Sequence, residues 1–108
     1  MSREIWKFKV NPLTSPIKMP IASTILSCGT QKETIYDTEQ GTLVLEHIFV
    51  WASVNPDECQ LVERTIYVIA TGQEVPDDVF FTMTFLGTVQ FKTGPLVFHL
   101  FFPSREQA

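Results

Sequence analysis

Two histidines and two cysteines have the most versatile chemistry in this sequence, and none of them has a neighbour that would complete a site. His47, His99, Cys28 and Cys59 are isolated along the chain, whereas a structural zinc ion needs four ligands at short paired spacings. A nucleophilic enzyme needs a Ser, Thr or Cys beside a base, and Cys59 has no nearby histidine. We therefore expect no metal, no cofactor and no catalytic centre.

Acid–base chemistry has two further candidates, and their surroundings favour structural roles. His99 lies in the apolar run Leu96–Phe102, which favours a strand histidine that packs at a sheet edge or bonds a backbone carbonyl. A ligand-contacting role for His99 is the alternative. Asp77 and Asp78 are adjacent and follow Pro76, so their carboxylates point apart, and they are typical of residues that open a helical turn.

Residues suited to binding are easier to find. Trp51 alternates with Phe49 a few residues before a turn, where an indole either stacks on a base, anchors a partner or packs in the core. Arg64 begins a predicted strand, and a guanidinium can hold a phosphate or a carboxylate with two hydrogen bonds. A surface ion pair with Glu63 or Glu46 is the structural alternative for Arg64.

These residues belong to segments in which apolar and polar residues alternate, and a period of two is typical of β-strands. Lys7 and Lys9, for example, fall on one face of the first segment. The predicted strands are Glu4–Val10, Ile17–Met19, Ala22–Cys28, Thr42–Val54, Leu61–Thr71, Phe80–Phe91 and Leu96–Phe102. We predict an all-β fold, either an antiparallel β-sandwich or a small barrel, with room for one short helical turn.

The segment Gly29–Leu45 interrupts this pattern. Its residues up to Gly41 are mostly polar, which predicts a protruding loop or hairpin in which Ile35 and Tyr36 make the one apolar contact. Long loops in compact domains usually have a function. We therefore expect this segment to take part in binding or in contacts between subunits.

Length and composition limit the possible functions. The chain has 108 residues, a net charge of −4 and an apolar fraction of 44%, which predicts a single domain spanning residues 1–108 with a sizeable core. The low isoelectric point of about 5.0 disfavours direct binding to DNA. No apolar run is long enough to span a bilayer, and two unlike cysteines do not suggest a disulfide framework. We expect a cytoplasmic protein.

Several predicted strands have apolar residues on both faces. In Leu61–Thr71, for example, Val68 and Ala70 alternate with Tyr67 and Ile69. A single core covers one face of a sheet, so a second apolar face indicates a further layer or a second copy of the chain. Because small domains gain stability by association, we expect a homo-oligomer, most simply with two-fold symmetry.

A set of short motifs resembles an uncharacterised family of small proteins from bacteriophages and prophages. The motifs cover most of the chain: Ile5-Trp6-Lys7-Phe8, Met19-Pro20, Ile25-Leu26-Ser27, Val50-Trp51-Ala52-Ser53-Val54-Asn55-Pro56, Glu63-Arg64-Thr65, Thr71-Gly72, Val75-Pro76, Phe85-Leu86-Gly87-Thr88-Val89-Gln90 and Leu96-Val97-Phe98-His99-Leu100-Phe101. The segment from about Gln31 to Leu45 is longer than is usual in that family. The resemblance implies a phage protein in a host bacterium and suggests a role against host immunity.

Two hypotheses of different classes follow. In the first, the protein is a homo-oligomeric sponge that sequesters a nucleotide signal, such as a cyclic dinucleotide. Trp51 or Tyr67 would then stack on a base, and Arg64, Lys7 or Thr71 would contact phosphate, with His99 as a further candidate contact.

In the second hypothesis, the protein blocks a host defence protein such as a nuclease, and the acidic residues Glu33, Asp37 and Glu39 occupy a basic cleft. A structural or assembly accessory of the phage is a third possibility.

Overall fold

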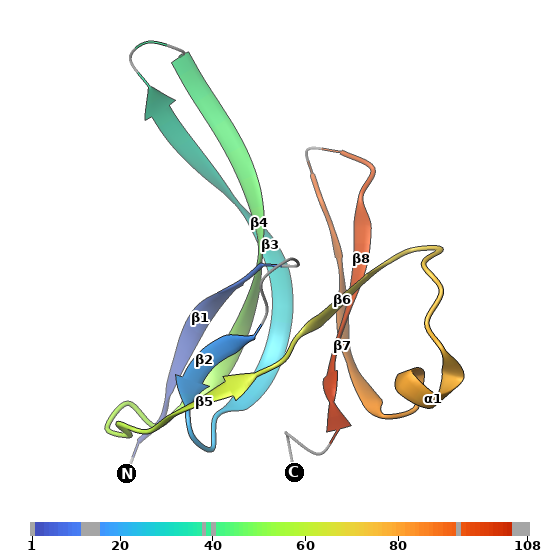
Figure 1. Ribbon diagram of the computed structural model, residues 1–108. Coiled ribbons are helices and arrows are strands. Elements are labelled where there is room, and N and C mark those ends of the chain that lie inside the picture. The colour runs from blue at the N-terminus through green and yellow to red at the C-terminus, as the bar shows by residue number, and fades with distance from the viewer. Residues whose placement is uncertain (1, 12–15, 38, 40, 93, 105–108) are drawn as a thin grey trace.

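The computed structural model describes residues 2–11, 16–37, 39, 41–92 and 94–104 (Figure 1). Every strand pairing in it is antiparallel, and the predicted all-β fold with one helical turn is confirmed. Its described strands do not close into a barrel. In chain order the elements are β1 (Glu4–Val10), β2 (Ile17–Pro20), β3 (Thr24–Asp37), β4 (Gly41–Val54), β5 (Leu61–Arg64), β6 (Tyr67–Ala70), α1 (Asp77–Phe80), β7 (Met83–Gln90) and β8 (Val97–Pro103).

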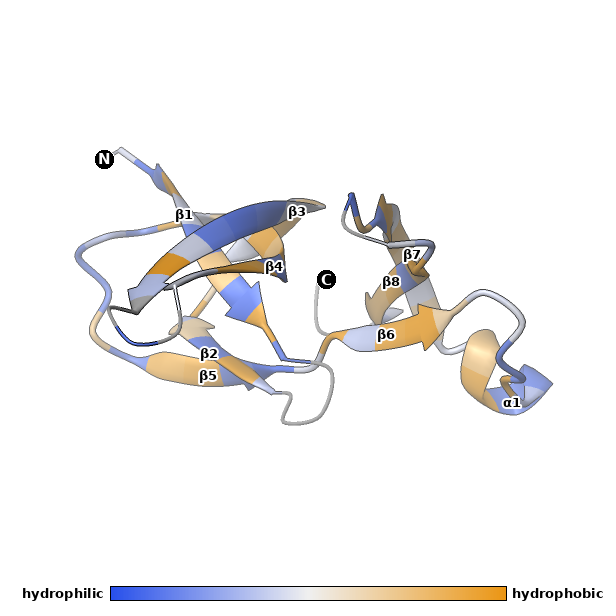
Figure 2. Ribbon diagram, turned by 90° about the horizontal axis from the view of Figure 1, so that it is seen from above, coloured by the Kyte–Doolittle hydropathy of each residue, from blue (hydrophilic) through white to orange (hydrophobic). Residues whose placement is uncertain are grey.

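The strands form three small sheets. Sheet A has the order β1-β4-β3, sheet B consists of β2 and β5, and sheet C has the order β6-β8-β7. Seen from above, sheets A and B form two layers and sheet C stands beside them, with α1 at its far side (Figure 2). The core lies between the three sheets and consists of Val10, Met19, Ile25, Ile48, Val50, Ala52, Val54, Ile66, Val89, Leu100 and Phe102.

The long strand β4 confirms the alternation seen in the sequence. Ile48, Val50, Ala52 and Val54 are buried, while the residues between them face outward and are half-buried. Side chains of a strand point alternately to opposite faces. The burial of these four residues therefore directs the side chains between them to the outer face of the sheet.

The prediction of a single strand over Leu61–Thr71 is wrong. The structure divides this segment into β5 and β6, which belong to different sheets. β5 pairs with β2, and β6 pairs with β8. Between them Ile66 is buried in the core, where the chain crosses from sheet B to sheet C. The alternation continues through this crossing, so a period of two alone cannot reveal it.

The polar segment after Gly29 is a regular hairpin, which was one of the two predicted alternatives. β3 continues without interruption to Asp37 and pairs residue by residue with β4, down to the pair Asp37–Gly41. Residues Gln31–Asp37 and Gly41–His47 extend beyond the three-stranded part of sheet A, and we call them the arm (Figure 1). Ile35 and Tyr36, the residues expected to make the apolar contact, are both exposed, and Ile35 lies opposite Leu43.

Sheets A and C meet at a close contact between Cys28 of β3 and Gly87 of β7. A Cβ atom at Gly87 would lie 2.7 Å from Cys28 Sγ, which is closer than real contacts allow. Nearby, Glu46 Oε2 accepts hydrogen bonds from Thr30 Oγ1 at 2.7 Å and from the backbone N of Lys92 at 2.9 Å. This carboxylate therefore ties the β7–β8 connection to sheet A.

We expect Gly87→Ala to destabilise the fold by about 1–3 kcal/mol, because the added methyl group overpacks the junction of sheets A and C. Urea unfolding of the purified chain measures this change. The double variant Gly87→Ala with Cys28→Ala removes the clashing sulfur and should recover part of the loss. Equal stability of the single variant and the wild type would show that the sheets do not approach so closely.

The two cysteines should differ in reactivity. Burial raises the pKa of the Cys28 thiol, whereas Cys59 is exposed. Since the thiolate is the reactive form, we expect Cys28 to react about tenfold or more slowly than Cys59 near neutral pH, and to accelerate as the pH approaches its raised pKa. Maleimide labelling followed by peptide mass spectrometry measures both rates. Labelling in denaturant is the control, and equal rates in the folded chain would contradict the structure.

The molecule is thin and extended. Its principal extents are 47 × 39 × 19 Å and its radius of gyration is 15.7 Å, against about 13 Å for a compact domain of 100 residues.

No helix among the described residues has the length and apolar character needed to cross a membrane. α1 covers part of the outer face of sheet C through the contact of Phe80 with Phe101. The outer faces of sheets A and C both carry exposed apolar side chains, such as Leu43 and Phe85.

Candidate functional site

The sequence-predicted site residues fall in different parts of the fold. Thr71 and His99 lie together on the outer face of sheet C, whereas Lys7 and Trp51 lie together on the outer face of sheet A. Tyr67 lies on the edge strand β6, and the remaining residue, Arg64, is buried.

The register of sheet C brings His99 between two threonines. His99 is opposite Thr88 of β7 and opposite Ile69 of β6, and the backbone N of Thr71 donates to Val97 O. A β-bulge between Phe85 and Gly87 inserts one extra residue into β7. Because of this extra residue, Phe85 and Thr88 lie on the same face, although they are three positions apart.

The imidazole of His99 has a hydroxyl partner on each side. Nε2 lies 2.8 Å from Thr71 Oγ1, and Nδ1 lies 2.9 Å from Thr88 Oγ1. The sequence favoured a position at a sheet edge or a bond to a backbone carbonyl, and instead His99 lies on the central strand β8 between hydroxyls. In a neutral imidazole one ring nitrogen donates and the other accepts, so the two threonines take opposite roles.

A pocket of about 390 Å³ opens beside this histidine, within the range of small-ligand sites. It is lined by Ile69, Ala70, Thr71, Gly72, Gln73, Val75, Asp77, Phe80, His99 and Phe101. Its rim is rigid at Gln73, whose backbone N donates to Ala70 O at 3.0 Å while its Oε1 accepts from Ala70 N at 3.1 Å. These two hydrogen bonds satisfy the backbone N and O of Ala70 on the edge of β6 that pairs with no strand in the described structure.

An aromatic cluster adjoins the pocket and was not predicted from the sequence. Phe101 contacts Phe80 and Phe85 with ring centroids 5.8 and 5.4 Å apart, and Phe80 contacts Phe81 at 5.5 Å. Phe81 is 78% exposed and Phe85 56% exposed. The sequence did contain a signal for exposed aromatic rings. Phe80 and Phe81 come shortly after Asp77 and Asp78, in a segment that is too short to bury both rings. We call the cluster and the pocket together the docking face.

Tyr67 borders a second pocket of about 460 Å³, which is also lined by residues of β6 and of its connection to α1. Ile69, Gln73 and Val75 line both pockets, so Tyr67 extends the docking face rather than forming a separate site.

Arg64 has a structural position. Its side chain is 5% exposed, and Nη1 donates to Ser23 O at 3.0 Å. Ser23 follows Ala22, which has a φ of 63°, so the guanidinium holds the strained turn between β2 and β3. Arg64 is therefore buried rather than at the surface.

We expect Arg64→Ala to lower the free energy of unfolding by about 1–3 kcal/mol, because a buried acceptor loses a donor. Urea denaturation measures the effect. Lys18→Ala, on the exposed position of the neighbouring strand β2, should change stability by less than about 0.5 kcal/mol. Similar stabilities for both variants would contradict a structural role for Arg64.

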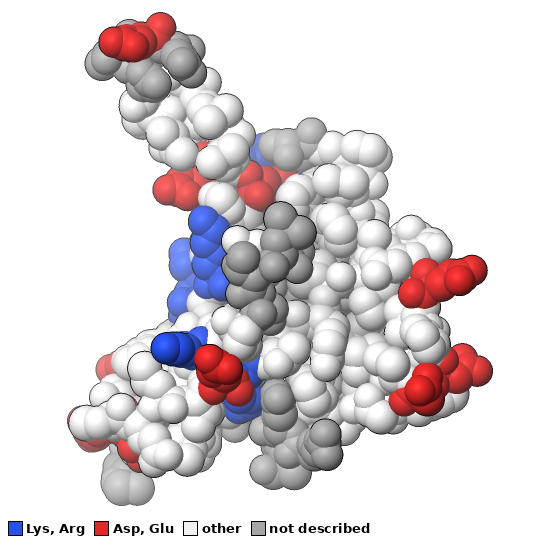
Figure 3. All heavy atoms as spheres, viewed as in Figure 1, with Lys and Arg blue, Asp and Glu red and all other residues white. Residues whose placement is uncertain are grey.

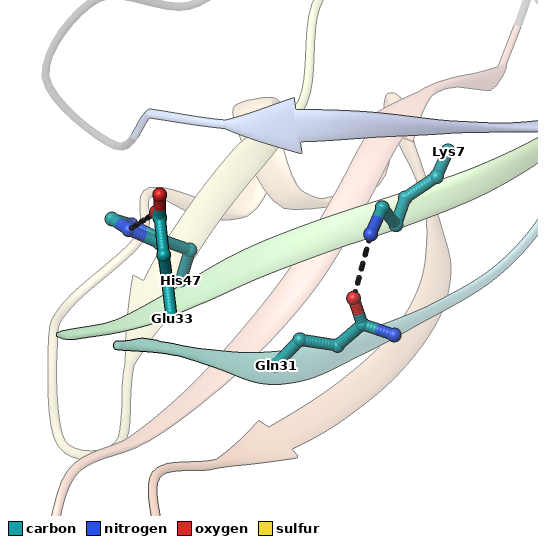
Figure 4. A network of polar contacts seen from close by, with 4 residues as sticks. All are labelled: Lys7, Gln31, Glu33 and His47. Atoms are coloured by element: carbon teal, nitrogen blue, oxygen red, sulfur yellow. Dashed lines mark hydrogen bonds and ion pairs between the residues drawn. The ribbon is translucent and has the colours of Figure 1, made fainter. Parts of the chain in front are cut away.

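Lys7 and Trp51 share the outer face of sheet A with other polar and aromatic groups. Figure 4 shows Lys7 there together with Gln31, Glu33 and His47. Lys7 Nζ donates to Gln31 Oε1 at 2.7 Å and lies 4.6 Å from the centre of the Phe49 ring. Trp51 is half-buried, and its ring covers Gly29, where a Cβ atom would lie 3.2 Å away. Trp51 is therefore packed on its own sheet with one side open.

The charge of the docking face disfavours anions. Among the described residues no lysine or arginine lines the pocket, and Asp77 does. Three or more metal-ligating side chains do not gather anywhere in the described part of the chain.

Comparison with known proteins identifies a family without an assigned activity. The family model described as "Domain of unknown function (DUF7352)" matches residues 1–108. No curated protein and no solved structure matches the chain. The expectation of an uncharacterised family is thereby confirmed, and any function must be argued from the geometry.

Proposed function

The chain belongs to this family of domains of unknown function, and we propose that it is a non-enzymatic binding protein that holds a basic partner protein on its docking face. The observation that carries this proposal is the group of exposed rings Phe80, Phe81 and Phe85, which pack around the buried Phe101 beside a pocket. Apolar patches rimmed by polar groups are typical of protein interfaces, and aromatic side chains provide much of the binding energy in such interfaces.

The charge around the docking face indicates the chemistry of the partner. Glu74 and Asp77 line the two pockets, and Asp78 is exposed on α1. Figure 3 shows acidic side chains at this end of the molecule, whereas both basic and acidic side chains are visible near β1. A partner with arginine or lysine at its interface would be attracted here and would associate faster than a neutral one.

The pocket fits a single planar side chain from that partner. Phe80 and Phe101 provide aromatic walls, the Thr71 hydroxyl and the Asp77 carboxylate are polar groups at the lining, and a guanidinium combines stacking on rings with donation to a carboxylate. The hydrogen bonds of His99 keep the Thr71 hydroxyl in position.

The resemblance to small bacteriophage proteins supports a narrower form of the proposal. A phage module without catalytic groups acts by occupying a surface, so the partner would be a host defence protein whose basic site is blocked. Nucleic-acid-binding clefts are basic, which makes a nuclease a suitable target. In this form the contacting acids are Glu74, Asp77 and Asp78 rather than those of the arm.

Fluorescence anisotropy with two labelled peptides of equal length, one alternating Arg with Trp and one alternating Glu with Trp, tests the proposal. We expect the chain to bind the Arg peptide in preference, and Phe81→Ser with Phe85→Ser to weaken binding tenfold or more. Tyr36→Ser removes an aromatic ring that is 82% exposed on the arm and should leave binding unchanged. Equal binding of both peptides, or equal loss in the control, would refute the proposal.

A small nucleotide ligand, as in the sponge hypothesis, remains the second candidate because the pocket volume of about 390 Å³ suits one base with its sugar. Thermal-shift assays with nucleosides and cyclic nucleotides distinguish the two. A shift lost in Thr71→Val but kept in the variant with Phe81→Ser and Phe85→Ser would favour the small ligand. Since the pocket is acidic, nucleosides should then give larger shifts than nucleotides.

A further inference from the structure

We propose that the protonation state of His99 controls the docking face, which holds its basic partner while the imidazole is neutral and releases it when the imidazole is charged. This inference rests on the function proposed above and adds how the same site is regulated. The geometry that carries it is the position of the ring between two hydroxyl groups at the wall of the pocket.

His99 belongs to the wall of the pocket and is held there at both ring nitrogens. Nε2 lies 2.8 Å from Thr71 Oγ1, and Nδ1 lies 2.9 Å from Thr88 Oγ1. The two partners come from opposite sides of β8, since Thr88 lies on β7 and Thr71 directly follows β6. A charge that forms on this ring therefore stays at the wall of the pocket.

The hydroxyl partners allow the ring to exist in either charge state. A hydroxyl group both donates and accepts hydrogen bonds, whereas an imidazolium donates from both nitrogens. When His99 takes up a proton, the threonine that donated to the ring turns its O–H away and becomes an acceptor, so both hydrogen bonds remain. A carboxylate in the place of either hydroxyl would favour the charged ring, and a backbone N–H would favour the neutral one. Protonation of His99 therefore requires no movement of the ring.

The groups that surround His99 are acidic or uncharged. Asp77 of α1 lines the same pocket, Asp78 is exposed on α1, and Glu74 of the connection between β6 and α1 lines the second pocket. The titratable side chain of β6 is Tyr67, and β7 and β8 contain no titratable side chain besides that of His99. Since no lysine or arginine lines the pocket among the described residues, the protonated imidazole is its positive group.

This positive charge acts directly on a cation in the pocket. The proposed guanidinium lies in a space whose walls include Asp77 and His99. The carboxylate attracts the cation and an imidazolium repels it, and both effects are stronger where the rings of Phe80 and Phe101 exclude water. Binding is therefore tight at higher pH, where His99 is neutral, and weakens as the pH falls through the range in which His99 takes up its proton.

The coupling between proton and partner is reciprocal. If the proton lowers the affinity for the cation by some factor, the bound cation lowers the affinity of His99 for the proton by the same factor. The inference can therefore be measured from either side, by the binding of the partner or by the titration of the histidine.

The second histidine of the chain provides an internal control. His47 lies on the outer face of sheet A, where its Nε2 is 3.0 Å from Glu33 Oε2 (Figure 4). It is not among the residues that line the two pockets of the docking face. Because the sequence contains two histidines, the variant His47→Gln shows whether an effect of pH comes from His99.

Fluorescence anisotropy tests the proposal at about pH 8 and about pH 5, the range in which an imidazole ordinarily changes its charge. The probe is the labelled peptide of alternating Arg and Trp, blocked at both ends so that it does not itself titrate there. We expect the wild type and His47→Gln to bind about tenfold more weakly at the lower pH, because two positive charges then share the pocket. His99→Gln keeps a donor and an acceptor but is never charged, so the ratio of its affinities at the two pH values should approach one.

A measurement on the unmutated chain makes the test independent of folding defects. The side-chain signals of His99 in NMR spectra report its titration with and without a saturating amount of the same peptide. We expect the bound peptide to shift the midpoint for His99 to an about tenfold higher proton concentration, which is the same coupling seen from the proton. The midpoint for His47 should not change.

The outcomes separate this inference from the proposed function. If the Arg peptide does not bind at either pH, both are refuted. If it binds, the control by His99 alone is refuted by equal affinities at the two pH values, by the same decrease in His99→Gln, or by a titration of His99 that the peptide does not shift.

Discussion

The burial of alternate residues along β4 is the constraint on which the rest of the structure depends. Ile48, Val50, Ala52 and Val54 fill the space between the sheets, and a shift of one position would move all four to the solvent face. Their burial sets the register with β1 and β3 together. It also directs His47, Phe49 and Trp51 outward, so the outer face of sheet A is a consequence of the core.

Sheet C depends on the same core from the other side. Leu100 and Phe102 of β8 are buried, which turns His99 and Phe101 toward the docking face. The bulge in β7 then places Phe85 and Thr88 beside them, and Gly87 approaches Cys28 at the junction with sheet A. The histidine site and the contact between the sheets thus share one short segment of β7.

The two outer faces of this thin fold differ in charge. The docking face is flanked by Glu74, Asp77 and Asp78, which under the proposed function attract basic groups. The outer face of sheet A contains Lys7 and Lys9 on β1 and Glu33 on β3.

Alternation along the chain predicted most of the strands, the position of Lys7 and Lys9 on one face, and the all-β class, because side-chain direction in a strand is a local property. The division of Leu61–Thr71 between two sheets, the burial of Arg64 and the hairpin after Gly29 depended on which strands became neighbours, and that is settled by packing across the whole domain. The same holds for the site: His99 and Thr71 were both candidates, but only the register of sheet C brought them together with Thr88 and Phe80. Strand pairing joins residues far apart in sequence, so the site could be assembled only in three dimensions.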